Sequence, residues 1–113
     1  MTAQDVITRA RYFVKDDIVP YRISDAAFFP QISDALVEMK ARRPDFLIKA
    51  DGTFASIADI TSVEDTINFP DRTREAIACY TAYRNYITDD ADRHNTSQAA
   101  AMLNRYESLM MTV

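Results

Sequence analysis

Residues 24–43, SDAAFFPQISDALVEMKARR, carry the clearest helical pattern in the chain. Apolar side chains recur every three or four residues, as expected for an amphipathic helix with one face in a core. These side chains are Phe28, Ile32, Ala35, Leu36 and Met39. Ser24 is a favourable cap for the amino terminus of such a helix, and Arg43 followed by Pro44 is a favourable end. The stretch therefore predicts a helix over about residues 25–43.

The same spacing predicts three more helices, and together the four apolar faces define a core. The expected helices cover residues 3–16, a segment that opens at Pro70-Asp71 and ends near Ile87, and a segment capped by Thr96 or Ser97. We expect these side chains to be buried together: Phe28, Ile32, Leu36, Ile77, Tyr80, Leu103 and Tyr106. Pro30 cannot donate a hydrogen bond to the carbonyl of Ala26, so the second helix is either kinked at Pro30 or restarts there.

The middle of the chain has a different pattern. Two apolar runs, residues 46–50 and 53–57, flank Asp51-Gly52, which favours a tight turn between strands. This pattern predicts a β-hairpin, and residues 65–69 can form a short third strand. The expected fold is thus mainly α: a single domain over residues 1–113, a small bundle of four main helices with a β-hairpin or long loop between helices 2 and 3.

Composition excludes several classes of function. The chain has 113 residues with one Gly, one Cys and one His. It cannot form a glycine-rich phosphate loop, a disulfide framework or a cysteine-based zinc cluster. The net charge is −4, and residues 58–113 hold five basic and nine acidic side chains, which is unlike the basic surface of a nucleic-acid-binding protein. Because no apolar run is long enough to span a membrane, we expect no membrane partner.

The reactive side chains form no recognisable catalytic or metal-binding pattern. Cys79 and His94 would need an orienting group and an oxyanion hole to act as nucleophile and base. The acidic run Asp89-Asp90-Ala91-Asp92 lacks the spacing, the glycine and the closing Glu of a calcium loop. We therefore expect no enzyme activity and no cofactor.

The order of short motifs along the chain is more informative than any single motif. In sequence they are Tyr21-Arg22-Ile23-Ser24-Asp25, Arg42-Arg43-Pro44-Asp45, Gly52-Thr53, Phe69-Pro70-Asp71-Arg72, Tyr83-Arg84, the acidic break at Asp89 to Asp92, and Gln98-Ala99. With this order, nearly the whole chain resembles the head–tail adaptor (connector) proteins of tailed bacteriophages. The resemblance implies a helical adaptor that forms a ring, typically of twelve copies, beneath the portal protein of the capsid. It also implies a channel for passing DNA without sequence-specific binding, and a docking surface for the next neck or tail protein.

These implications define a set of candidate residues. The expected interface residues are Arg42, Arg43, Phe46, Ile48, Asp51, Gly52, Phe54 and Ile57. The acidic excess favours Asp89, Asp90 and Asp92 as residues that face the channel. The expected location is the virion neck, with the host cytoplasm during assembly. The alternative is a small cytoplasmic helical module for protein–protein interaction, such as a regulator or an antitoxin-like binder.

Overall fold

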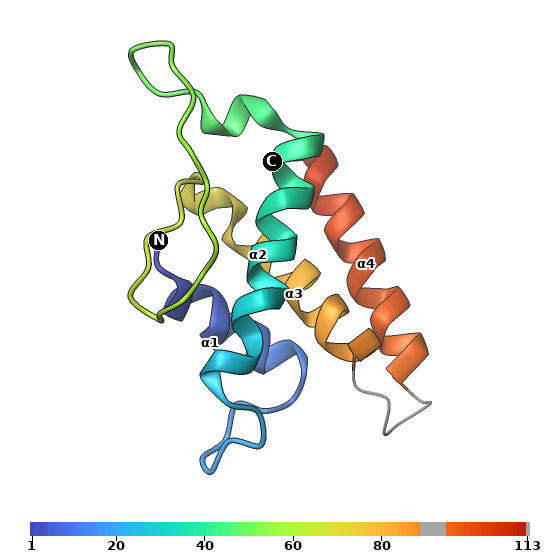
Figure 1. Ribbon diagram of the computed structural model, residues 1–113. Coiled ribbons are helices and arrows are strands. Elements are labelled where there is room, and N and C mark those ends of the chain that lie inside the picture. The colour runs from blue at the N-terminus through green and yellow to red at the C-terminus, as the bar shows by residue number, and fades with distance from the viewer. Residues whose placement is uncertain (89–94, 113) are drawn as a thin grey trace.

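The computed structural model describes residues 1–88 and 95–112 (Figure 1). Within these residues the helical elements are, in chain order, α1 (Ala3–Phe13), α2 (Asp25–Arg42), η1 (Pro44–Leu47), η2 (Asp71–Thr73), α3 (Arg74–Thr88) and α4 (Asn95–Thr112), where η1 and η2 are 3₁₀ helices. Helix α3 contacts each of the other three α-helices. The principal extents are 46, 28 and 19 Å. The predicted mainly α class with four helices is confirmed for this part of the chain.

The helix starts follow the local sequence. The Thr2 hydroxyl accepts a hydrogen bond from the Asp5 N–H, and the Asp5 carboxylate accepts one from the Thr2 N–H, which forms a capping box for α1. The predicted Ser24 cap is confirmed, because its Oγ accepts from the Ala27 N–H at 3.3 Å. Helix α2 continues through Pro30 without a break. The predicted alternative in which a new helix starts at Pro30 is therefore excluded.

Two predicted helix ends differ from the structure. Helix α1 ends at Phe13 rather than near residue 16, because Lys15 has a φ of +59° and Asp16 folds back to the side chain of Arg11. Helix α4 begins at Asn95, so Thr96 lies inside the helix instead of capping it.

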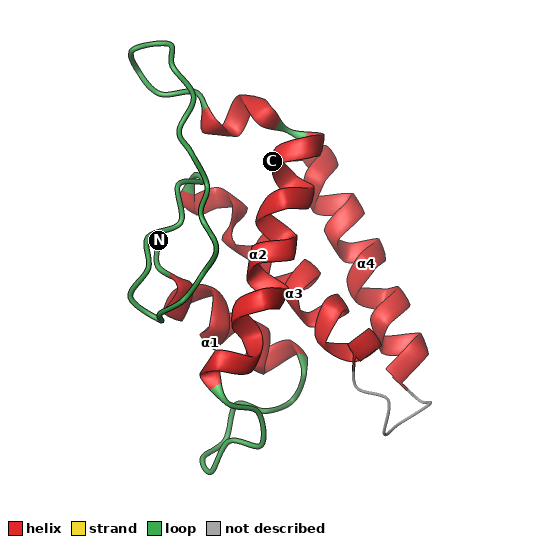
Figure 2. Ribbon diagram, in the orientation of Figure 1, coloured by secondary structure: helices red, strands yellow, loops and turns green. Residues whose placement is uncertain are grey.

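The predicted β-hairpin is wrong: the described residues contain no strand (Figure 2). Phe46 and Leu47 are adjacent in sequence, and both are buried. Successive side chains of a strand point to opposite faces, so a strand with one face in the core would expose one of the two. The 3₁₀ helix η1 allows both side chains to reach the core. What remains of the hairpin is a single bridge between Ile48 and Phe54 around the predicted turn. The proposed third strand is likewise reduced to one bridge, between Thr66 and Thr2.

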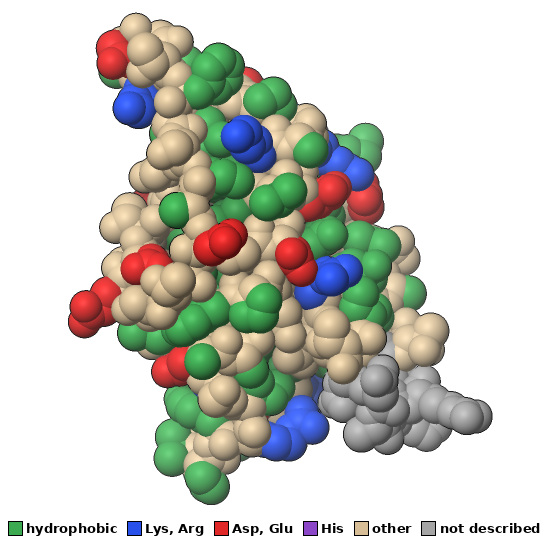
Figure 3. Space-filling model, viewed as in Figure 1, with side chains coloured by type: hydrophobic (Ala, Val, Ile, Leu, Met, Phe, Trp, Pro, Cys, Tyr) green, Lys and Arg blue, Asp and Glu red, His purple; other side chains and the backbone are tan. Residues whose placement is uncertain are grey.

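The core lies between α1, α2 and α3, with one edge covered by α4. Five of the seven predicted core side chains are buried: Phe28, Ile32, Leu36, Ile77 and Tyr106. Tyr80 and Leu103 are only partly buried and pack against this core. Figure 3 shows one face of the molecule, on which acidic and basic side chains are interspersed with apolar ones. No helix in the described residues is both long enough and apolar enough to cross a membrane.

Candidate interaction surfaces

A loop at one end of the long axis projects from the helical body (Figure 1). We call residues 48–54 the tip. Its two large apolar side chains are exposed, Ile48 by 51% and Phe54 by 63%. Because both side chains lie beyond the core, the tip is an apolar surface that the described chain leaves uncovered.

The tip is ordered by short-range hydrogen bonds. The Lys49 N–H donates to the Thr53 carbonyl at 2.7 Å, and the Gly52 N–H donates to the Lys49 carbonyl at 3.0 Å. The carboxylate of Asp51 accepts from the N–H and the hydroxyl of Thr53, which holds the pKa of Asp51 below its ordinary value. Gly52 has a φ of +86°, a conformation that favours glycine. The bonds within the turn are therefore local, and the Ile48 and Ala55 N–H groups connect its two ends to η1.

The base of the tip is anchored in the core. Phe46 is 6% exposed, and the guanidinium groups of Arg43 and Arg72 lie over its ring at 4.2 and 5.2 Å. Ile57 is partly buried against the same core. Of the apolar interface candidates, the structure therefore places Phe46 and Ile57 in or against the body, and Ile48 and Phe54 at the surface.

The two candidate arginines form ion pairs within the molecule. Arg42 donates two hydrogen bonds to Glu107 of α4 and lies 3.7 Å from Glu38, and the Glu107 contact raises the pKa of Arg42. Arg43 pairs with Asp45 at 3.0 Å and lowers the pKa of that carboxyl. Both arginines connect the end of α2 to neighbouring segments, in addition to any role at an interface.

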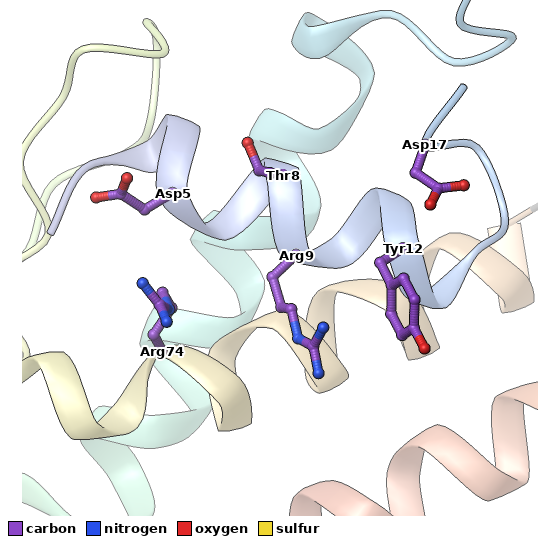
Figure 4. A pocket seen from close by; sticks show the side chains of 6 residues that line it. All are labelled: Asp5, Thr8, Arg9, Tyr12, Asp17 and Arg74. Atoms are coloured by element: carbon purple, nitrogen blue, oxygen red, sulfur yellow. The ribbon is translucent and has the colours of Figure 1, made fainter. Parts of the chain in front are cut away.

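A hollow of about 440 Å³ lies between α1, the start of α3 and the loop that follows α1 (Figure 4). We call it the α1/α3 hollow. Its lining residues are Asp5, Thr8, Arg9, Tyr12, Asp17 and Arg74. Figure 4 shows Arg74 and Asp5 at one end, Tyr12 and Asp17 at the other, and Arg9 between them. The sequence does not predict this hollow: five of its lining residues lie within residues 5–17, but Arg74 joins them only through the packing of α3 against α1.

The charges in the hollow differ in how they are paired. Arg9 donates two hydrogen bonds to Glu75, at 2.9 and 2.8 Å, and its guanidinium lies 4.7 Å from the centre of the Tyr12 ring. These bonds lower the pKa of Glu75. Neither the Asp17 nor the Arg74 side chain makes a hydrogen bond or ion pair within residues 1–88 and 95–112, but the backbone N–H of Arg74 donates to the Asp71 carbonyl and the charge of Arg74 interacts with Asp5. Tyr12 is 56% exposed. The hollow thus offers an aromatic ring, an anion and a cation that are accessible to a partner.

The loop beside the hollow is held by a buried ion pair. Arg11 donates to Asp16 at 2.8 Å, to the Ile23 carbonyl at 2.7 Å and to Asp25 at 2.7 Å. Asp16 also accepts from the N–H groups of Arg22 and Ile23, at 2.8 and 2.9 Å. Because Arg11 and Asp16 are almost fully buried, this network fixes the path of residues 14–24 and the position of Asp17.

The remaining reactive groups form no catalytic or metal site in the part of the chain that the structure describes. Cys79 is fully buried, and burial raises the pKa of its thiol to about 11. No group of three or more His, Cys, Asp or Glu side chains is arranged to hold a metal ion there. The predicted channel residues Asp89, Asp90 and Asp92 lie outside the described residues.

The chain was compared with known protein families, with curated proteins and with solved structures, and none of these matches it.

Proposed function

We propose that this chain is a non-enzymatic structural protein of a tailed-phage neck. As a head–tail adaptor it forms a ring beneath the portal protein, extends the DNA channel and docks the next neck or tail component. The order of motifs along the sequence motivates the proposal, and one structural observation carries it. That observation is the exposed apolar tip at the end of a small helical body, with Ile48 and Phe54 set beyond the core. A subunit of a ring needs such a surface, because its neighbours cover what a monomer exposes.

The charge balance supports a passive role toward DNA. The net charge is −4, and the acidic excess lies in residues 58–113. A channel that DNA slides through must avoid dense clusters of cations, since phosphate contacts dominate DNA affinity. We therefore keep Asp89, Asp90 and Asp92 as residues facing the channel.

The test is assembly on a portal ring from the genome that encodes this chain. We expect the free chain to elute near its monomer mass of 12.9 kDa and the portal ring to recruit a full ring of copies, as measured by light scattering and native mass spectrometry. The double variant Ile48→Ser/Phe54→Ser should lose the ring. A matched control is Val37→Ser, which removes a side chain of 59% exposure from α2 and should leave assembly unchanged. A portal ring that recruits no copies of the wild-type chain would overturn the proposal.

Amide exchange gives an independent readout of the same event. We expect low protection over residues 47–57 in the free chain, because the hydrogen bonds of these N–H groups are short-range and most of the segment is exposed to solvent. Protection should rise strongly when the ring forms and neighbours cover the tip. Equal protection in both states would move the assembly contact from the tip to the helix surfaces.

A further inference from the structure

The tip and the α1/α3 hollow lie on different parts of the molecule. In Figure 1 the tip projects from one end of the body, and Figure 4 places the hollow along α1, beside the start of α3 and the loop that follows α1. A ring of more than two identical copies requires such an arrangement, because each copy must offer one surface to the neighbour ahead and a different one to the neighbour behind. A contact between two identical patches would close a dimer instead.

We propose that the tip of one copy docks in the α1/α3 hollow of the next copy. This inference rests on the proposed function, which requires a ring, and it names the two surfaces that form the ring contact. The occupant of the hollow is a second copy of this chain.

The shapes and apolar groups of the two surfaces match. The tip is a narrow convex loop that presents Phe54, and the hollow is open and concave, with the exposed ring of Tyr12 at one end. Docked there, Phe54 meets the Tyr12 ring and the guanidinium of Arg9. Aromatic pairs and an arginine over an aromatic ring both stabilise such contacts. The volume of about 440 Å³ is large enough for one aromatic side chain and part of the loop that carries it.

The charges of the two surfaces also match. Lys49 lies beside Ile48 on the tip, and its side chain is exposed. Asp17 lines the hollow beside Tyr12, is exposed, and makes no ion pair among the described residues. Lys49 of one copy can therefore pair with Asp17 of the next while Phe54 contacts Tyr12. At the other end of the hollow, Arg74 lies beside Asp5, and in this arrangement its charge also attracts Asp51 of the neighbouring tip.

The contact is small, and this determines how it acts. Stable protein complexes use about 20–30 residues on each side, far more than a seven-residue tip supplies. One tip in one hollow is therefore weak in solution, and it becomes effective when many copies are held in one ring. This is the behaviour expected of a subunit that stays monomeric until a portal assembles it.

Cysteine cross-linking between two differently labelled chains tests the contact without needing a stable complex. Ala50→Cys places a thiol on the tip, and Thr8→Cys places one in the hollow; Cys79 is buried and gives little background. Under mild oxidation, a mixture of the two variants should form the mixed disulfide about tenfold faster than Ala50→Cys mixed with Met111→Cys, because docking raises the local thiol concentration. Met111 is 87% exposed and lies outside both surfaces, so it is the matched control. Adding Phe54→Ser to the Ala50→Cys chain should lower the rate of disulfide formation to that of the control.

A charge exchange tests the pairing. We call the chain that carries Ala50→Cys the tip chain and the chain that carries Thr8→Cys the hollow chain. Lys49→Glu in the tip chain, or Asp17→Lys in the hollow chain, should lower the rate of disulfide formation by about two- to fivefold, the range that an exposed ion pair gives. A Lys49→Glu tip chain mixed with an Asp17→Lys hollow chain should recover the wild-type rate, and the effect should fade at high salt. Failure of this recovery overturns the pairing of Lys49 with Asp17.

The same cross-link is measured on copies bound to the portal ring, which separates the two proposals. If the portal recruits a ring but the mixed disulfide forms no faster than the control, the proposed function stands and the tip-in-hollow contact is wrong. If the mixed disulfide forms and the portal recruits nothing, the contact stands as self-association and the adaptor role is wrong. Faster joining of two Ala50→Cys chains than of the mixed pair would show a contact between identical tips and overturn the inference.

Discussion

The buried ion pair between Arg11 and Asp16 gives the sharpest test of the structure. Replacing Asp16 by Asn keeps the shape of the side chain and removes its charge. Arg11 then stays almost fully buried with only Asp25, which is half-exposed, as an anionic partner. The N–H groups of Arg22 and Ile23 lose a carboxylate acceptor in the same change.

The expected loss follows from the burial. Removing one member of a buried ion pair costs about 3–5 kcal/mol, because the other charge stays away from water without compensation. For a chain of 113 residues, average unfolding entropies convert 1 kcal/mol into about 4 °C, so Tm should fall by about 12–20 °C. Asp17→Asn is the matched control: its side chain is exposed and unpaired within the described residues, so the change should stay within about 0.5 kcal/mol.

The dependence on pH gives a second readout. Burial works to raise the pKa of Asp16, but the N–H donors of Arg22 and Ile23 and the charge of Arg11 outweigh it and hold the pKa below the ordinary value of 3.8. A carboxyl whose pKa is lowered by folding stabilises the protein above its unfolded-state pKa, and this contribution is lost as the pH falls through the lowered value. Thermal unfolding followed by circular dichroism should therefore show a large gap between wild type and Asp16→Asn at pH 7 that narrows below about pH 4. Equal losses for Asp16→Asn and Asp17→Asn would refute the buried ion pair.

Four further substitutions test other parts of the fold by the same unfolding measurement. Tyr106 is fully buried and its hydroxyl has no partner among the described residues, so Tyr106→Phe should leave stability unchanged or raise it by up to about 2 kcal/mol; a clear loss would show that the hydroxyl is bonded. Leu36→Ala should cost about 2–5 kcal/mol and Leu103→Ala distinctly less, because Leu36 is 2% exposed and Leu103 is only partly buried; similar costs at both sites would contradict this placement of α4. Pro30→Ala should raise stability by about 1–3 kcal/mol, since it restores an N–H donor to the carbonyl of Ala26 within α2; a loss would mean that the proline ring supports the helix.

Local sequence signals predicted the helices but not all of their ends. Ser24 and the apolar repeat after it specify α2 through contacts within a few residues, which a single sequence shows directly. The early end of α1 depends on Asp16 reaching Arg11, and that bond exists only once the loop has closed over the core. The hairpin prediction failed for a related reason: Phe46 and Leu47 are apolar enough for a strand, but both are buried in the core.

The candidate surface was predicted in part. The turn at Asp51-Gly52 and the exposure of Ile48 and Phe54 follow from residues that lie close together in sequence. The α1/α3 hollow follows only from tertiary packing, because Tyr12 and Arg74 lie on different helices. The spacing of Asp5, Thr8, Arg9 and Tyr12 places these four residues on one face of a helix, but no pattern in the sequence places Arg74 against that face.

The ion pairs of the arginines explain why the assembly proposal is based on exposed apolar side chains. Arginine is enriched in protein interfaces, which made the arginine-rich segments candidates for subunit contacts. In the structure, however, six arginines form ion pairs within the molecule: Arg9, Arg11, Arg42, Arg43, Arg84 and Arg105. A partner that used these cations would first have to break bonds that tie the helices together. The exposed apolar side chains of the tip carry no such cost, because a partner that covers Ile48 and Phe54 displaces only water from them. Under the proposed tip contact, the internal ion pairs stay intact, so the proposal requires no change of fold between a free chain and a member of a ring.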